Sequence, residues 1–194
     1  MKPKFEYYNS LFEYRKATDE DFENFERETK LKLPKNLKKF IKKAGTKSPE
    51  PDTFRIYGNS VDDYSDCDTI YGFPGETLKE GADEEKFKRR VEMAARCGGG
   101  PNDGEDLLCV WKKYRGRIPS DLLPFGSSSS GDQICLKLEG DDAGSVWLWM
   151  HGEEYEPEDD EIPRDNCYFC AHSLKEFLKS FLDEDEIDDD YDDE

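Results

Sequence analysis

Apolar residues recur at helical spacing near the start of the chain, where Phe22 and Phe25 lie three positions apart. Thr18 and Asp21 accompany them, a hydroxyl and a carboxylate at the spacing of a helix-capping box. In this motif the two side chains bond to amides that the start of a helix leaves without partners. The pattern predicts a helix that begins after Thr18 and runs to about Lys30.

A second helical stripe follows Leu33-Pro34, with Leu37, Phe40 and Ile41 at positions i, i+3 and i+4. Gly45 comes after this stripe, and glycine adopts the left-handed conformation of a helix cap at low cost. We therefore predict a second helix that Gly45 ends. The lysines on its other faces are interpreted as a solvated surface rather than a basic patch: Lys35, Lys38, Lys39, Lys42 and Lys43.

Alternating and continuous apolar runs predict strands elsewhere in the chain. Residues 54–57 and 134–138 alternate, as short strands with one buried face do. Residues 146–151 are almost wholly apolar, which indicates a strand that is either buried on both faces or has one exposed apolar face. Because short turns containing glycine join 134–138 to 146–151 and to the apolar run at 122–125, we expect these three strands to form an antiparallel meander.

Two further helices are predicted in the remaining sequence. Phe87 and Val91 lie four positions apart within 83–95, which indicates a third helix. Ser173 and Glu176 form a second capping box. After it, apolar residues fall on one face of a helix that would close the domain: Leu174, Phe177, Leu178, Phe181 and Leu182.

The charge of the chain limits the classes of molecule that it can bind. The chain has 47 acidic and 28 basic residues, and its formal net charge is −19. Residues 183–194 hold ten acids and no base, and such a tail has little to bury and repels itself. We therefore expect one domain over 1–182 and a disordered, solubilising tail over 183–194, with a role of the tail in recognition as the alternative. A negative field of this size repels nucleic acid and anionic membranes, and it favours a basic protein partner.

The compartment is inferred from what the sequence lacks. It has no apolar run long enough for a membrane helix, and residues 1–5 lack the apolar core of a secretory signal. We expect a cytoplasmic protein on these grounds. Because that compartment is reducing, most of the cysteines are interpreted as small reduced core residues. They are Cys67, Cys97, Cys109, Cys135, Cys167 and Cys170.

Cys167, Cys170 and His172 form the one local arrangement that resembles a metal or redox motif. Structural zinc needs four ligands, usually from two such pairs, and the sequence has no second pair. His151 follows an apolar strand and is interpreted as a structural residue. No serine lies in a Gly-x-Ser-x-Gly pattern. We expect no enzyme activity, cofactor or metal, and a zinc-dependent enzyme built on the first three residues stays open as an alternative.

A second acidic stretch, residues 152–165, lies between predicted ordered elements and contains a tyrosine. A tyrosine ring provides contact area, and carboxylates around it speed the encounter with a basic partner. The predicted partner-binding residues are therefore Glu153, Glu154, Tyr155, Glu158, Asp159 and Asp160.

Four segments, in order along the chain, resemble motifs of one superfamily: 33–41, 123–138, 144–151 and 171–178. The third reads Gly-Ser-Val-Trp-Leu-Trp-Met-His. It is similar to the Gly-x-Val-Tyr-x-Trp-Asp-His strand of the SUKH superfamily, named for fungal cell-wall assembly regulators and bacterial immunity proteins. The chain departs from the family at Met150, where an acid is frequent, and at Ala44 and Thr46. Residues 58–117 match none of its motifs.

The resemblance implies an α+β fold, in which N-terminal helices pack on a twisted, mainly antiparallel sheet and a C-terminal helix closes the domain. It also implies function by protein binding. Bacterial members are immunity proteins that neutralise polymorphic toxins, often nucleases, and an acidic chain suits a basic toxin. We therefore expect an immunity protein, with a regulatory scaffold of the cell-wall regulator type as the alternative.

Overall fold

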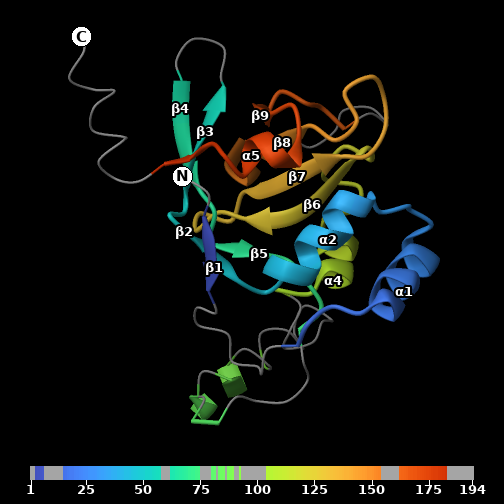
Figure 1. Ribbon diagram of the computed structural model, residues 1–194, viewed down its shortest axis with the longest axis vertical. Helices are drawn as coiled ribbons and strands as arrows, with labels where there is room; N and C mark the ends of the chain where they lie inside the picture. Colours follow the sequence, from blue (N-terminus) through green and yellow to red (C-terminus); the bar gives the residue numbers. More distant parts are fainter. Residues whose placement is uncertain are drawn as a thin grey trace.

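The computed structural model describes residues 3–6, 15–57, 62–74, 80–81, 83–85, 87–89, 92, 104–153 and 162–182. These residues form a mixed fold of α-helices around a curled antiparallel sheet (Figure 1). None of the described helices is long and apolar enough to cross a membrane. The helical elements are α1 (Asp19–Thr29), α2 (Lys35–Ala44), α4 (Leu107–Tyr114), the 3-10 turn η1 (His151–Glu153) and α5 (Leu174–Phe177).

Eight strands of the described part of the chain form the main sheet. They are β3 (Thr53–Tyr57), β4 (Asp62–Asp66), β5 (Thr69–Ile70), β6 (Leu122–Ser127), β7 (Gln133–Lys137), β8 (Val146–Trp149), β9 (Cys167–Ala171) and β10 (Phe181–Leu182). Their order across the sheet is β10, β3, β9, β8, β7, β6, β5, and β4 pairs with β3. A separate antiparallel ribbon joins β1 (Lys4–Glu6) to β2 (Ser48–Glu50).

The predicted meander is confirmed, since β6, β7 and β8 are consecutive antiparallel neighbours. Apolar side chains fill both faces of its central strand, where Ile134, Cys135 and Leu136 are each fully buried. In β8, Leu148 and Trp149 point to opposite faces, and both are buried. Burial on both faces is therefore confirmed at Leu148 and Trp149, while Trp147 and Met150 of the same run are only partly buried.

The two N-terminal helices form where the local pattern placed them. At the start of α1, the Thr18 hydroxyl accepts a bond from the Asp21 amide at 3.3 Å, and an Asp21 carboxylate oxygen accepts from the Thr18 amide at 2.7 Å. Phe22 and Phe25 are buried on the face that meets the rest of the protein. The capping box thus fixes the first turn, and burial of the two rings stabilises the helix.

The end of α2 differs from the prediction in its physical cause. Gly45 does end the helix, but its φ is −58°, so it is not a left-handed cap. Thr46 adopts the positive φ instead, at 61°. A side chain at position 45 would lie 3.1 Å from the Cα of Gly72 and 2.8 Å from the carbonyl oxygen of Ile41. Glycine is needed here because two backbone segments approach each other, which the sequence pattern alone does not reveal.

The predicted closing helix is wrong over its second half. The Ser173 hydroxyl caps α5 as expected, by accepting from the Glu176 amide at 3.2 Å, but the helix ends at Phe177. Phe181 then pairs with Phe54, so β10 extends the sheet along the edge of β3. The apolar spacing suits a helix, but the open strand edge supplies backbone partners that no local pattern shows. The described residues at 84, 85, 87–89 and 92 are helical, in agreement with the predicted third helix.

A chain of aromatic contacts shows that α2 and α5 cover the same face of the sheet (Figure 1). Phe40 of α2 packs on Phe125 of β6, with 6.2 Å between ring centroids. Phe125 in turn packs on Phe177 of α5 at 6.0 Å, and Phe177 on Phe181 of β10 at 5.1 Å. Phe40 and Phe177, the rings that α2 and α5 contribute, are each less than 10% exposed, so the prediction that the helices bury one stripe is confirmed at these positions.

Candidate functional site

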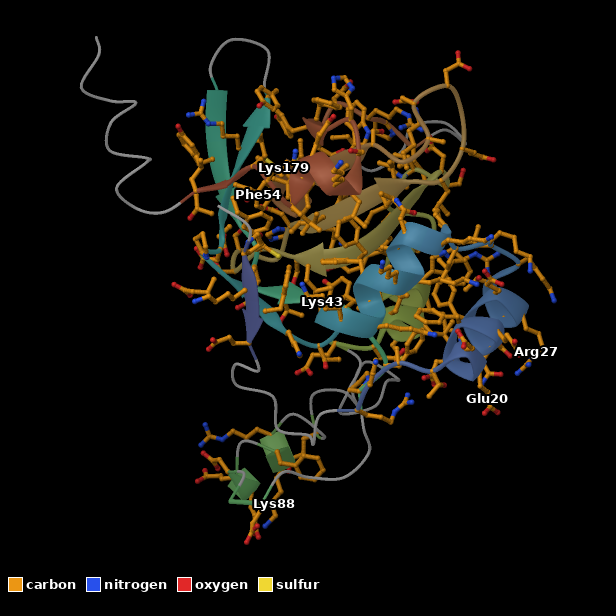
Figure 2. The ribbon with its side chains drawn as sticks, in the orientation of Figure 1. Glu20, Arg27, Lys43, Phe54, Lys88 and Lys179 are labelled. Carbon is orange, nitrogen blue, oxygen red and sulfur yellow. The ribbon has the colours of Figure 1, made fainter. Side chains whose placement is uncertain are left out.

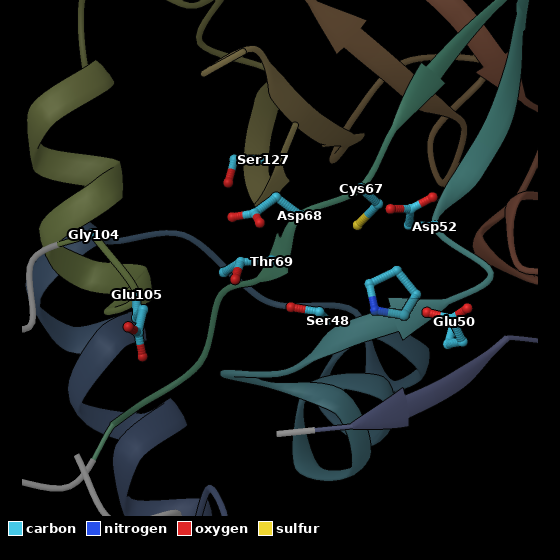
Figure 3. Close-up of a pocket in the computed structure, with 10 residues that line it drawn as sticks. Ser48, Glu50, Asp52, Cys67, Asp68, Thr69, Gly104, Glu105 and Ser127 are labelled. Carbon is cyan, nitrogen blue, oxygen red and sulfur yellow. The ribbon is translucent and has the colours of Figure 1, made fainter. Parts of the chain in front are cut away.

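A pocket of about 460 Å³ lies where the β1–β2 ribbon meets the β5 edge of the main sheet (Figure 3). Four separate segments of the chain contribute to it. We call it the acidic pocket, and its lining residues are Ser48, Pro49, Glu50, Asp52, Cys67, Asp68, Thr69, Gly104, Glu105 and Ser127.

Backbone bonds hold the carboxylates of this pocket close together. The Cys67 amide donates to the carbonyl oxygen of Asp52 at 2.9 Å, which ties the start of β3 to the end of β4. The Asp68 amide donates to the carbonyl oxygen of Ser127 at 2.8 Å, at the end of β6. Figure 3 shows Cys67 between Asp52 and Asp68. The arrangement is therefore set by the sheet rather than by bonds between the side chains.

The electrostatic field in the acidic pocket is negative. Partial burial raises the pKa of the Asp68 carboxyl above its usual range, and the charges of Asp66 and Asp52 raise it further. No Lys or Arg among the described residues forms an ion pair with Asp52 or Asp68. A group of like charges without a counter-ion favours the binding of a cation from outside.

Cys67 does not supply a nucleophile to this pocket. Its side chain is fully buried, and burial raises the pKa of the thiol well above its usual range, with further contributions from Asp66, Asp68 and Asp52. Since the reactive form of cysteine is the thiolate, the thiol stays protonated and unreactive at neutral pH. The lining also contains no histidine. What the described lining presents to a ligand is therefore mainly the charge of its carboxylates.

A second polar cluster lies at the turn between β6 and β7. One carboxylate oxygen of Asp132 lies 2.8 Å from His151 Nδ1 and accepts from the His151 amide at 3.0 Å. The other accepts from the Ser130 hydroxyl at 2.8 Å. Partial burial opposes ionisation of Asp132, but the bonds from His151 and Ser130 hold its pKa below the usual range.

The order of contacts in this cluster is not that of a hydrolase. In a Ser-His-Asp site the histidine lies between serine and carboxylate, so that it can take the serine proton. Here the carboxylate of Asp132 lies between Ser130 and His151. The contacts instead fasten the start of η1 to the β6–β7 turn, which agrees with the interpretation of His151 as a structural residue.

The cysteine pair considered for zinc lies on β9. Cys170 is buried, and its thiol lies 3.7 Å from the carbonyl oxygen of Tyr168, while the His172 ring stacks on Phe169 with centroids 4.7 Å apart. Burial raises the pKa of the Cys167 thiol to about 11, whereas zinc is bound by thiolates. Within the described ranges no three His, Cys, Asp or Glu side chains gather as a metal site requires. These contacts give the zinc-enzyme alternative no support.

Of the predicted partner-binding residues, one lies within the described part of the chain. Glu153 is the last residue of η1. The other predicted residues lie outside the described residues, so their role stays a prediction: Glu154, Tyr155, Glu158, Asp159 and Asp160.

Sequence reasoning missed the acidic pocket because its charges come from different segments. Asp66 and Asp68 flank Cys67, and Glu50 and Asp52 flank a proline, so each pair repeats an acid two positions apart. That spacing places both acids of a pair on one side of an extended chain. In a chain with 47 acids the spacing is a weak signal, and only the sheet brings the two pairs together.

Comparison with known proteins agrees with the resemblance seen in the motifs. The chain is 29% identical over 83 residues to YokK, an uncharacterized SPbeta prophage-derived protein of Bacillus subtilis (strain 168). That match spans 43% of this chain and 38% of the relative. No solved structure gives a significant match. The sequence model of the SMI1/KNR4 family, also called SUKH-1, matches residues 16–180. Since this match covers most of the chain, the chain belongs to the SMI1/KNR4 (SUKH-1) family.

Proposed function

We propose that this protein is a cytoplasmic, non-enzymatic binding module that acts as an immunity protein. In this proposal it neutralises a basic toxin domain, such as a nuclease, by direct contact. The family to which the chain belongs includes toxin-immunity proteins, which supports the proposal. The observation that carries it is the acidic pocket, in which Asp52 and Asp68 lie beside a protonated thiol and have no basic partner among the described residues.

The pocket suits the side chain of a lysine or arginine from a partner. Ion pairs at an interface are strong when the charges are removed from water and geometrically matched. The acidic pocket offers carboxylates on opposite sides, from Glu50 and Asp52 to Glu105, with partly desolvated Asp68 between (Figure 3). A bound cation would relieve the repulsion that raises the pKa of Asp68.

The pocket and the predicted acidic loop are linked by one short turn. An Asp66 carboxylate oxygen accepts from the Ser129 amide at 2.8 Å, next to the pocket residue Cys67. Three residues after Ser129, Asp132 holds the amide and ring of His151, the residue from which the loop begins. We propose that a basic partner contacts both places. The pocket would take a basic side chain, and the acidic loop, residues 152–165, would add a second acidic contact.

The first experiment identifies the partner and then tests the site. The purified full chain captures proteins from a lysate of the source cell, and mass spectrometry identifies those retained at high salt. Calorimetry then measures binding of the purified partner to the double variant Asp52→Asn/Asp68→Asn. We expect binding weaker by about tenfold or more, because two charges that face the partner are removed. The double variant Glu20→Gln/Glu28→Gln, which removes two exposed acids from α1, is the matched control and should bind normally.

Three outcomes would count against the proposal. A captured partner that binds the pocket variant with unchanged affinity would exclude the acidic pocket as the site. Unchanged affinity after Glu153, Glu154, Asp159 and Asp160 are all replaced by lysine would exclude the loop. Capture of several signalling or cell-wall proteins in place of one basic toxin domain would favour the regulatory scaffold.

A further inference from the structure

The five lysines of α2 fall into two groups with different surroundings. Lys38 Nζ lies 2.7 Å from Glu26, and Lys42 Nζ lies 2.6 Å from Asp19, so both pair with acids of α1. Both ammonium groups also lie 5.8 Å from the centre of the Phe22 ring. These two lysines are part of the contact between the helices.

The other three lysines form an exposed stripe. Lys35, Lys39 and Lys43 have no ion pair or side-chain hydrogen bond with any residue that the structure describes. They are spaced four apart and therefore lie on one side of α2, where like charges repel. We call these three residues the lysine stripe. In a chain of net charge −19, such a concentration of exposed basic groups calls for a counter-ion.

A second helix on the same face of the sheet carries further exposed lysines. Lys175 and Lys179, in and directly after α5, are exposed and likewise lack a charged partner among the described residues. Since α2 and α5 cover the same face of the sheet, these lysines lie on the same side of the protein as the lysine stripe. Figure 2 labels Lys43 and Lys179 on this side of the molecule.

The acidic tail, residues 183–194, starts close to this surface. It follows β10 directly, and it carries ten acids and no base. Three successive ring contacts of 5.1, 6.0 and 6.2 Å lead from Phe181 of β10 through Phe177 and Phe125 to Phe40 of α2. An extended segment of this length spans about 40 Å, so the tail can reach the whole of α2 from its starting point.

We propose that the acidic tail lies across the lysine stripe as an intramolecular electrostatic strap. The tail need not adopt one fixed conformation, because ten carboxylates can exchange among a few ammonium groups. Attachment to the same chain gives the tail a high local concentration at the stripe. In this arrangement the carboxylates of the tail neutralise the lysine stripe and compete with anionic partners for it. This proposal rests on the lysines and the tail alone, so it holds whether or not the protein is an immunity protein.

Carbodiimide cross-linking of the full chain tests this proposal, because the reagent joins a carboxylate to an amine only when the two are in contact. Equal amounts of ¹⁴N- and ¹⁵N-labelled protein are mixed, so that mass spectrometry separates links within a chain from links between chains. At low salt we expect links from 183–194 to the lysine stripe to exceed those to the exposed Lys88 and Lys112 by about tenfold. In 1 M salt the Debye length falls to about 3 Å, and the excess should disappear.

A matched pair of triple variants provides a second measurement. The variant Lys35→Gln/Lys39→Gln/Lys43→Gln keeps good helix formers in α2, so folding should be retained. Its tail amide NMR signals should shift at low salt toward their positions in 1 M salt. The control Lys16→Gln/Lys88→Gln/Lys112→Gln removes the same charge elsewhere and should leave the tail signals unchanged.

The proposal is overturned if the tail links equally to all exposed lysines, or if its links do not respond to salt. Tail signals that are the same in the stripe variant and the unmodified chain would also overturn it. Links found only between ¹⁴N and ¹⁵N chains would assign the lysine stripe to a second copy of the protein instead.

Discussion

The Lys38 ammonium of α2 lies 2.7 Å from a carboxylate oxygen of Glu26 in α1, and the Leu33 amide donates to that same oxygen at 2.9 Å. Lys32 lies 3.2 Å from the other oxygen. A single carboxylate thus holds together the first helix, the connecting segment and the second helix. Burial alone would raise the pKa of Glu26, but the bonds from Lys38, Leu33 and Lys32 lower it to about 2.

We predict that Glu26→Gln destabilises the protein by about 1–2 kcal/mol at pH 7, a value discounted for solvent screening of the lysines. Because the folded-state pKa lies below the ordinary value of 4.5, the stabilisation is present above pH 4.5 and is lost as the pH falls toward 2. Urea unfolding from pH 7 to pH 2.5 should show the two proteins converging. Glu28→Gln on the exposed side of α1 is the control. A difference that stays constant over this range would mean that the charge of Glu26 is not responsible.

The opposite pH dependence is expected for Asp68, whose pKa is raised by partial burial and by Asp66 and Asp52. Ionised Asp68 destabilises the folded state, so Asp68→Asn should stabilise the protein at pH 7. We expect a gain of no more than about 0.5 kcal/mol, a value discounted for solvent screening because the side chain is exposed. The gain should vanish as the pH falls below the ordinary carboxyl range, where the aspartate is protonated in both states. Thermal unfolding at pH 7 and pH 3 measures this. Destabilisation at pH 7 would show that the side chain has a favourable partner.

The close approach of Gly72 to Gly45 predicts a local steric penalty. A Cβ at position 72 would lie 2.9 Å from the Cα of Gly45 and 3.0 Å from its carbonyl carbon, and both are backbone atoms. We expect Gly72→Ala to destabilise the protein by about 1–3 kcal/mol, since the backbone must move. Gly152→Ala is the control, because nothing lies within 4 Å of its added Cβ. Equal stability of the two variants in urea unfolding would contradict the contact.

Phe177 joins three other rings, at 4.9 Å from Phe54, 6.0 Å from Phe125 and 5.1 Å from Phe181. It is fully buried, so Phe177→Ala should cost about 3–5 kcal/mol through lost burial and a residual cavity. Phe169→Ala removes a half-buried ring of the same size and should cost clearly less. Denaturant unfolding measures the loss of stability in both variants. A larger loss in Phe169→Ala than in Phe177→Ala would mean that α5 is not anchored through this cluster.

The sequence predicted those elements whose signals are local. The Thr18–Asp21 box starts α1 because each side chain bonds to an amide three residues away. The meander was equally predictable, because its strands are joined by short turns and buried on both faces. These signals lie within a few residues of the structure that they determine.

The failures have the opposite origin, since each depends on a distant part of the chain. The end of α5 is set by the edge of β3, where Phe181 pairs with Phe54. Gly45 is required by Gly72 rather than by its own φ. The acidic pocket combines the segments around Asp52 and Asp68 with the end of β6. Spacing along a sequence carries no information about which segments will meet, so these features had to come from the fold.

The hydrogen bonds between Gly72 and the start of α4 have a consequence for where the length of the chain can change. The Gly72 amide donates to the carbonyl oxygen of Glu105 at 2.9 Å, and the Leu107 amide donates to the carbonyl oxygen of Gly72 at 2.8 Å. These two bonds hold the beginning and the end of the segment between Gly72 and Glu105 together, and we call this point the neck. The entropy of closing such a loop changes only slowly with its length. A change of chain length between Pro74 and Gly104 should therefore cost little stability, because the neck fixes the register of the sheet whatever the length of the segment.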